Sequence, residues 1–199
     1  MGSDELDQPM DMLEAHVKKH FSLSASSLAE FLSPWKTYHA ERKEILTHQG
    51  EQEKYLYFVL DGVQRVYALN IEGKEATLIF TYAPSFGGVL NAMMTQQPSQ
   101  FFYETLTSSS FLRAPASEIK RIMLTNAEIA QMINFGISGA LSGVLDRLAE
   151  LQLMSSEEKF RSLLKRSPHI LTLVPHKYLA SYLGIDATNF SKLMNRVKI

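Results

Sequence analysis

Cysteine is absent from the 199-residue chain, which excludes disulfides, thiolate nucleophiles, cysteine-ligated zinc and iron–sulfur clusters. Apolar runs of about eighteen residues, the length that spans a membrane, are absent as well. The first eight residues are acidic and polar, unlike a secretory signal. Hydrophobic residues still make up 45% of the chain, enough to bury a core. We therefore expect a cytoplasmic globular protein without a membrane partner.

Motifs of catalysis and metal binding are also missing. Gly87-Gly88 lacks the third glycine of a dinucleotide loop, and the serines at 108–110 lack a Gly-x-Ser-x-Gly elbow. None of the six histidines forms His-Glu-x-x-His. His39 and His48 could approach each other in a roll, as cupin ligands do, but a third ligand at matching spacing is lacking. We expect no catalytic residue, no metal site and no cofactor.

Charge is divided unevenly along the chain. The whole chain has a formal net charge of −1. Residues 159–199, however, contain eight Lys/Arg and one acidic residue, a net of +7. A basic C-terminal segment on an acidic body is typical of a protein that binds nucleic-acid phosphates.

This basic segment includes residues 174–199, whose pattern is typical of a helix-turn-helix. Pro175 suits the first turn of a helix, and the small Ala180 allows two helices to cross closely. Gly184 tolerates the positive φ of a tight turn, and Asp186 is a good N-cap for a second helix. The alternative is an ordinary helical hairpin with a solvated polar face, which the charge disfavours.

The second helix of this motif has one apolar and one polar face. Phe190, Leu193 and Val197 are spaced to be buried. Exposed residues near the start of a recognition helix read base edges, whereas basic and hydroxyl side chains around it bind phosphates. The expected base-reading residues are Thr188, Asn189 and Lys192, and the expected phosphate contacts are Lys177, Ser191, Arg196 and Lys198.

The middle of the chain has the texture of short strands. Residues 37–48, 55–61, 63–70 and 75–82 are rich in aromatic and β-branched residues and alternate with turn signals. Asp61-Gly62 indicates a hairpin. Further strands are expected at 101–106 and 110–114, and short helices at 10–19, 24–32, 91–94 and 118–124. Such a spacing of strands predicts an antiparallel roll.

Residues 126–154 form the longest helical pattern. Apolar residues recur at steps of four and three, which is a coiled-coil seam. Glycines 136, 139 and 143 each cost about 1 kcal/mol inside a helix, so we expect another backbone to approach them. The alternative is a helix packed only on its own domain. The seam consists of Ile137, Leu141, Val144, Leu148 and Leu151.

The expected fold class is α+β with three parts. Residues 1–125 form N-terminal helices and a β-roll, and 126–154 form a dimerisation helix. Residues 155–199 form an all-α helix-turn-helix domain. That domain begins with a capping box, Ser155 with Glu158, and an extended link at 170–174 leads into the helix-turn-helix.

This order of parts resembles the Crp/Fnr family of bacterial transcription regulators. The resemblance is carried by the stretches Ile45–Glu51 and Tyr57–Gly62, by Phe86-Gly87 and by the stretch Leu179–Ile185. It implies a homodimer with a cyclic-nucleotide-binding-type domain and two recognition helices in successive major grooves. A pseudo-palindromic DNA operator is the implied partner, and RNA polymerase is a further one.

The chain departs from the family at the ligand pocket. In cyclic-AMP-binding members a Glu after Phe-Gly holds the ribose and a later Arg holds the phosphate. The matching positions here are Gly88 and Gln100, and an amide lacks the charged fork that a phosphate requires. We expect a degenerate pocket, formed by Gly87, Gly88, Val89, Gln100 and Phe101, that does not bind cyclic AMP; its effector is unknown.

Two functions stay open at this point. One is a homodimeric, sequence-specific DNA-binding regulator. The other is a small-molecule-binding roll protein, a cupin-like sensor whose helical tail serves assembly.

Overall fold

A computed structural model describes the backbone of residues 4–197 and the side chains of residues 8–197. The chain divides into two compact units. The first combines residues up to Val66 with Phe80–Ile137, and the second combines Tyr67–Ile79 with the residues from Ser138 onward.

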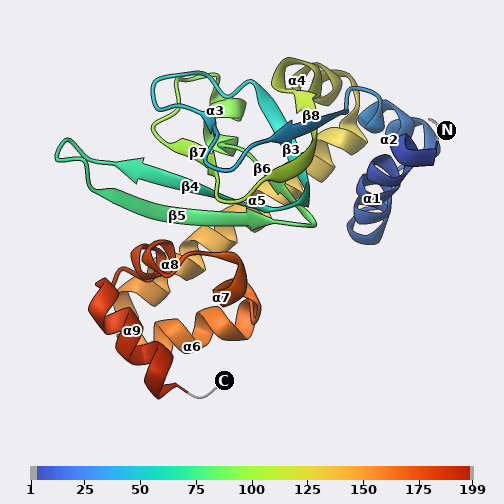
Figure 1. Cartoon of the computed structure of the whole chain (residues 1–199). Coiled ribbons are helices and arrows are strands. Elements are labelled where there is room, and N and C mark those ends of the chain that lie inside the picture. Colours follow the sequence, from blue (N-terminus) through green and yellow to red (C-terminus); the bar gives the residue numbers. More distant parts are fainter. Residues whose placement is uncertain (1–3, 198–199) are drawn as a thin grey trace. The chain divides into compact units, whose positions relative to one another are not determined.

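Two four-stranded antiparallel sheets form the roll (Figure 1). Their strand orders are β1-β8-β3-β6 and β2-β7-β4-β5. The roll and the α+β class agree with the sequence prediction. The strands are β1 (Lys36–Ala40), β2 (Ile45–Thr47), β3 (Tyr55–Asp61), β4 (Val63–Leu69), β5 (Glu75–Tyr82), β6 (Ser85–Gly87), β7 (Phe102–Thr105) and β8 (Ser109–Pro115).

Two strand predictions were wrong. The expected strand at 37–48 is two strands, β1 and β2, which belong to different sheets. Asp61-Gly62 does not close a hairpin, because β3 and β4 also belong to different sheets. Gly62 has φ +87, and a Cβ there would lie 2.6 Å from the Ser108 carbonyl oxygen. The glycine therefore allows the chain to turn sharply against the neighbouring segment while it changes sheets.

Both faces of the first sheet are covered. Its inner face packs on the second sheet through an aromatic cluster that includes Tyr57, Tyr103 and Phe111. Its outer face, with Leu56, Phe58 and Leu112, packs on apolar residues of the helices. Such two-sided burial explains why β3 is a nearly continuous apolar run, since both sets of alternating side chains are inside.

Four helices belong to this unit, besides the first residues of α5. Ser24, the first residue of the helix predicted at 24–32, caps α2 by accepting a hydrogen bond from the Ser27 N–H. The Ser24 N–H in turn donates to the Glu128 carboxylate, 2.8 Å away. The four are α1 (Asp4–His20), α2 (Ala25–Leu32), α3 (Leu90–Thr95) and α4 (Ala116–Thr125).

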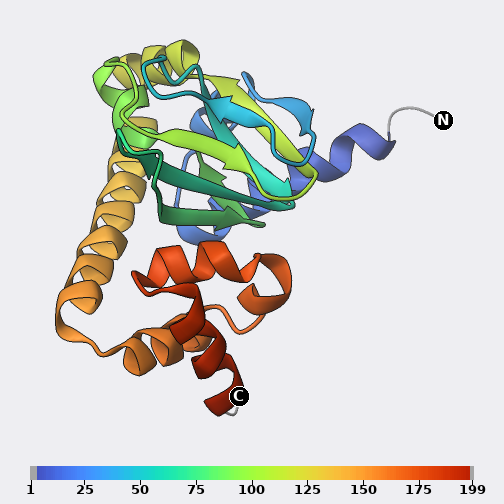
Figure 2. The same cartoon turned by 60° about the vertical axis from the view of Figure 1, so that its left-hand side comes forward.

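Helix α5 (Ala127–Leu153) is continuous, as predicted, and four shorter helices follow it (Figure 2). The predicted capping box at Ser155 and Glu158 is present. The expected extended link at 170–174 was wrong, because α7 forms a single turn there. Ile170 anchors that turn by being buried. The helices are α6 (Ser156–Arg166), α7 (Ile170–Leu173), α8 (His176–Leu183) and α9 (Ala187–Arg196).

Candidate functional site

Helices α8 and α9 have the turn that the sequence predicted. Gly184 has φ +63 and ends α8 in the left-handed conformation, which a glycine adopts without strain. The Asp186 carboxylate accepts the Asn189 N–H at 2.7 Å and caps α9. Ala180 is buried between the helices. Pro175 lies at the N-cap, one residue before α8 rather than inside its first turn.

The buried face of α9 fixes this helix on the C-terminal unit. Phe190 is fully buried, and its ring lies edge-on against Phe160 of α6 with centroids 5.5 Å apart. Leu193 and Val197 are buried as well. A rigid base of this kind lets the opposite face of α9 be presented in a fixed direction.

That opposite face is polar, but its side chains differ in how exposed they are and in whether they already form hydrogen bonds. Thr188 and Lys192 are exposed. Asn189 is half-buried, and its side-chain N–H donates to the Ser156 hydroxyl at 3.2 Å. Reading a base with Asn189 would therefore require this hydrogen bond to be exchanged.

The expected phosphate contacts also lie on the surface. Lys177 and Arg196 are exposed. Ser191 is exposed too, although its hydroxyl donates to the Ala187 carbonyl at 3.0 Å. Lys198 lies outside the described residues.

The basic charge of the C-terminal segment is only partly available. Lys159 is buried, Arg161 pairs with Glu157, and Arg166 pairs with Glu150. Among the described residues, four exposed basic side chains of this segment form no ion pair: Lys165, Lys177, Lys192 and Arg196.

A buried ionic network connects α5, α6 and α8, and the sequence analysis missed it. The Glu150 carboxylate accepts two hydrogen bonds from Arg166, at 2.6 and 2.9 Å, and one from Ser162 at 2.7 Å. Arg147 lies 3.5 Å from the same carboxylate, donates to the Tyr182 carbonyl and stacks on the Tyr182 ring. The network ties the first helix of the motif to the end of α5.

The predicted seam of α5 is an uncovered apolar face. Ile137 is half-buried, and Leu141 is 57% exposed, Val144 46%, Leu148 49% and Leu151 40%. So large a row of exposed apolar side chains is unusual on a monomer and marks an interaction surface. A Cβ added at Gly136, Gly139 or Gly143 would meet nothing within 4 Å, which leaves room for another backbone.

The predicted effector pocket lies beside β6. A Cβ at Gly87 would lie 2.3 Å from the Tyr103 hydroxyl, and Gly88 has φ +112, which side chains rarely adopt. The Val89 N–H donates to the buried Glu53 carboxylate at 2.8 Å, as does the Thr47 hydroxyl. Burial raises the pKa of Glu53, although the hydrogen bonds from Val89 and Thr47 oppose this.

The other two residues of the predicted pocket, Gln100 and Phe101, lie in different environments. Gln100 is exposed, whereas Phe101 is half-buried and packs on the aromatic cluster between the sheets. Burial also raises the pKa of the neighbouring Tyr103 hydroxyl, which stays neutral. The region where the family places a cyclic nucleotide is thus lined by aromatic rings and a carboxylate of the chain itself.

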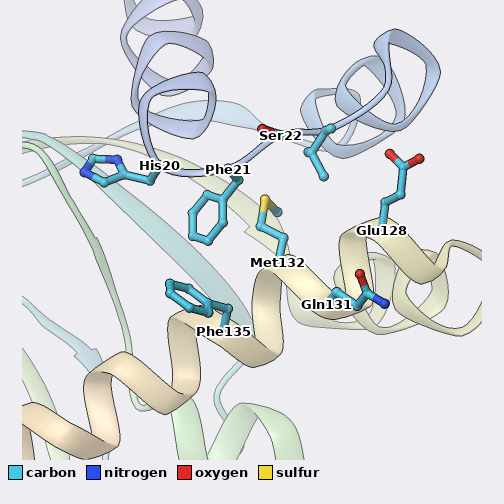
Figure 3. Close-up of a pocket in the computed structure, with 8 residues that line it drawn as sticks. His20, Phe21, Ser22, Glu128, Gln131, Met132 and Phe135 are labelled. Atoms are coloured by element: carbon cyan, nitrogen blue, oxygen red, sulfur yellow. The ribbon is translucent and has the colours of Figure 1, made fainter.

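A separate hollow of about 300 Å³ lies between the α1–α2 loop and the start of α5. Figure 3 shows Phe21, Met132 and Phe135 around it, with Glu128 at one side. Phe135 is 69% exposed and meets Phe21 edge-on. Glu128 already accepts the Ser24 N–H, so its charge is satisfied without a ligand.

Two further features are absent from the described part of the chain. No helix there combines the length and apolar character needed to cross a membrane. No three acidic or histidine side chains there gather closely enough to hold a metal ion. His39 bonds instead to the Ser110 hydroxyl at 3.0 Å, and the His48 ring lies against Phe102.

Comparison with known proteins identifies the roll. Residues 38–126 match the family described as cyclic nucleotide-binding domain. Among curated protein sequences, none matches this chain.

Solved structures resemble nearly the whole chain. FixK2 from Bradyrhizobium japonicum has a TM-score of 0.75 at 15% identity, covering 81% of this chain and 83% of its own. A regulator assigned to the Crp/Fnr family from Eubacterium rectale has a TM-score of 0.70 at 20% identity, covering 87% and 83%. CLP from Xanthomonas campestris, described as a c-di-GMP-responsive global regulator, has a TM-score of 0.65 at 14% identity, covering 87% and 91%.

These structures have one fold in common, a roll followed by a long helix and a helical C-terminal part. Residues 38–126 thus belong to the cyclic nucleotide-binding domain family, and the chain has the fold of these regulators. This fold agrees with the resemblance inferred from the sequence, and the similar structures described by function are regulators rather than enzymes.

Proposed function

We propose that the protein is a homodimeric, sequence-specific DNA-binding transcription regulator of the cytoplasm. The observation that carries the proposal is α9, a helix with a buried apolar face and an exposed face bearing Thr188, Lys192 and Arg196. Its N-terminal end is the part that enters a major groove in helix-turn-helix proteins. We assign effector, dimerisation and DNA-binding roles to residues 1–125, 126–154 and 155–199.

Base reading and phosphate binding are assigned to different side chains. Lys192 stands one turn into α9 and can bond a guanine edge. Thr188 lies near the start of α9 and is assigned to base reading. Asn189 is assigned to base reading too, and to contact a base its side chain must give up its hydrogen bond to Ser156. Lys177, Ser191 and Arg196, together with Lys198, are assigned to phosphates, which fix register without reading sequence.

Lys192→Ala is expected to relax sequence preference, because a good base contact is worth about 1–3 kcal/mol of discrimination. Arg196→Ala should instead weaken binding to all sequences alike, since a phosphate contact reads no base. Gel-shift titration of both variants on the selected site and on single-base variants of it measures the difference. If Lys192→Ala discriminates among these sites as well as the wild type, the base-reading assignment is wrong.

The dimer follows from the uncovered face of α5. In our proposal the seam from Ile137 to Leu151 pairs with that of a second copy across a two-fold axis. Two recognition helices would then meet half-sites one helical turn, about 34 Å, apart. The glycines of α5, which have free space around them, allow close approach of the second chain.

We also propose that the roll does not use cyclic AMP. The φ of +112 at Gly88 disfavours the Glu that holds the ribose in the family, and Glu53 lies next to this position. The negative charge of a cyclic phosphate would be repelled by the Glu53 carboxylate. The arginine that binds the phosphate in cyclic-AMP-binding members is also missing, because Gln100 stands at its position. Phe101 further reduces the space by packing inward.

Cyclic AMP and cyclic GMP are therefore expected to show no micromolar binding in isothermal titration of the full chain. The absence of one charge-assisted contact costs about 1.5–3 kcal/mol, and two such contacts are missing here. Micromolar binding of either nucleotide would overturn this interpretation of Gly88 and Gln100.

A second candidate function, a small-molecule-binding roll whose tail serves only assembly, is favoured by one observation, the uncovered seam. A measurement of DNA binding distinguishes the regulator from the assembly module. A regulator binds a specific duplex with an affinity that falls steeply with salt, whereas an assembly module does not.

A further inference from the structure

The part of β5 up to Ile79 belongs to the same compact unit as α8, and one side chain joins them. β5 is at the edge of its four-stranded sheet, and the outer side of an edge strand has backbone groups that no neighbouring strand binds. The Ser181 hydroxyl of α8 accepts the Thr77 N–H of β5 at 3.0 Å and lies 3.5 Å from the Glu75 carbonyl oxygen, to which it donates. Ser181 therefore bonds to this strand edge where a further strand would pair.

The surroundings of this contact strengthen it. Thr77 is buried, at 4% exposed, and Ser181 is half-buried. A hydrogen bond that is shielded from water is electrostatically stronger than one in solvent. The contact is therefore more than a chance approach of two surface groups.

A second contact holds α8 from another direction. Arg147 of α5 donates to the carbonyl of Tyr182 and stacks on the Tyr182 ring. Consecutive residues of a helix point about 100° apart, since a turn has 3.6 residues. Ser181 and Tyr182 thus anchor α8 to β5 and to α5 in two directions, which fixes the rotation of α8 about its own axis.

Helix α9 must follow α8, because the connection between them is short and internally bonded. Gly184, Ile185 and Asp186 form the whole connection. The Ile185 N–H donates to the Ala180 carbonyl at 3.1 Å, and the Asp186 side chain caps α9. A change in the direction of α8 would therefore turn the exposed face of α9 as well.

We propose that Ser181 is a positioning residue for DNA recognition. By bonding to β5 it holds α8, and through α8 the recognition helix, in the direction in which a dimer can place both recognition helices in major grooves. Ser181 itself contacts no DNA in this proposal. The inference rests on the proposed DNA binding and deepens it, since it names the contact by which the β4–β5 hairpin sets the direction of α9.

The contact itself can be tested without DNA, because the chain contains no cysteine. The double variant Ala76→Cys with Ser181→Cys places two thiols beside this contact, since Ala76 is the exposed residue between Glu75 and Thr77. A short bismaleimide should cross-link them within one chain in native buffer but not in denaturing urea. Absence of a native cross-link, or cross-links only between two chains on a denaturing gel, would overturn the contact.

Replacing Ser181 by Ala is expected to weaken binding of the selected duplex about tenfold to a hundredfold. Each lost hydrogen bond corresponds to a factor of about three to ten, and a dimer loses two of them. Binding to an unrelated duplex depends mainly on charge, so it should change less than about threefold. Gel-shift titration of the full-length chain measures both affinities.

Two variants distinguish positioning from a general loss of structure. Ser181→Thr keeps the hydroxyl and should bind the selected duplex within about threefold of the wild type, by the factor for a single hydrogen bond. Thr172→Ala is the control, because it removes an exposed hydroxyl that bonds within its own turn, and it should bind as the wild type does. Circular dichroism and sedimentation check that each variant is folded and has the oligomeric state of the wild type.

The cross-linked protein decides the direction of the effect. Before cross-linking, Ala76→Cys with Ser181→Cys should bind DNA as weakly as Ser181→Ala, and cross-linking should restore the affinity. The positioning role is refuted if folded Ser181→Ala binds as the wild type does, or if cross-linking weakens binding, which would make the contact inhibitory. If the wild type binds no duplex, the proposed function fails and the positioning role fails with it, while the native cross-link would still establish the contact.

Discussion

Replacing Leu141 and Leu148 together by Asp is expected to convert the proposed dimer into a monomer or an insoluble chain. Each leucine buried at an interface contributes about 2 kcal/mol, and the two-fold axis doubles the number to four side chains. Since 1.4 kcal/mol corresponds to a factor of ten in Kd, a loss of about 8 kcal/mol would weaken the dimer by about six orders of magnitude. Aspartates facing each other without partners add to the loss.

Sedimentation velocity measures this change, and the chain offers a matched control. Leu124 on α4 and Leu153 on α5 are even more exposed, at 88% and 84%, and neither belongs to the seam. Their double replacement by Asp should leave the dimer intact. A dimer that survives Leu141→Asp with Leu148→Asp would place the interface on another surface.

Glu150→Ala is expected to destabilise the C-terminal unit by about 3 kcal/mol. Removing one partner of a buried ion pair costs about 3–5 kcal/mol because the other charges stay buried without compensation. The lower end applies here, since the Arg166 side chain is 43% exposed. Glu157→Ala is the control, because its pair with Arg161 is exposed and such pairs contribute about 0–1 kcal/mol.

Urea denaturation followed by circular dichroism compares these variants, and pH gives a second signature. Burial tends to raise the pKa of Glu150, but the hydrogen bonds and charges of Arg166, Ser162 and Arg147 bring it below its ordinary value. A carboxyl whose pKa is lowered on folding stabilises above its unfolded pKa, about 4.3, and loses this contribution as the pH falls. The difference in the free energy of unfolding between the wild type and Glu150→Ala should therefore become smaller below about pH 4. If Glu150→Ala and Glu157→Ala were equally stable at pH 7, the ionic network around Glu150 would not stabilise the C-terminal unit as proposed.

Local signals account for what the sequence predicted well. The Ser155 capping box, the Asp186 cap and the left-handed Gly184 each depend on residues within about four positions. The seam of α5 is a periodic pattern, which reports a helical face directly. These features could be read without knowing what packs against them.

Partners distant in sequence account for what was missed. Gly62 has the turn chemistry of a hairpin, but β4 pairs with β7, a strand far along the chain, and with β5 rather than with β3. Glu53 finds its partner Val89 36 residues away, and Glu150 meets Arg166 16 residues away. No local pattern distinguishes these carboxylates from solvated ones. The short α7 was missed because one buried residue, Ile170, decides its conformation.

Sequencing the DNA fragments that the purified full-length protein retains from a random duplex pool tests the central claim most directly. The account predicts enrichment of a pseudo-palindrome whose half-sites lie one helical turn apart, about 10 base pairs centre to centre. Retention should decline steeply between about 50 and 200 mM salt. Recovery of fragments without a common sequence, or no retention at low salt, would contradict the account.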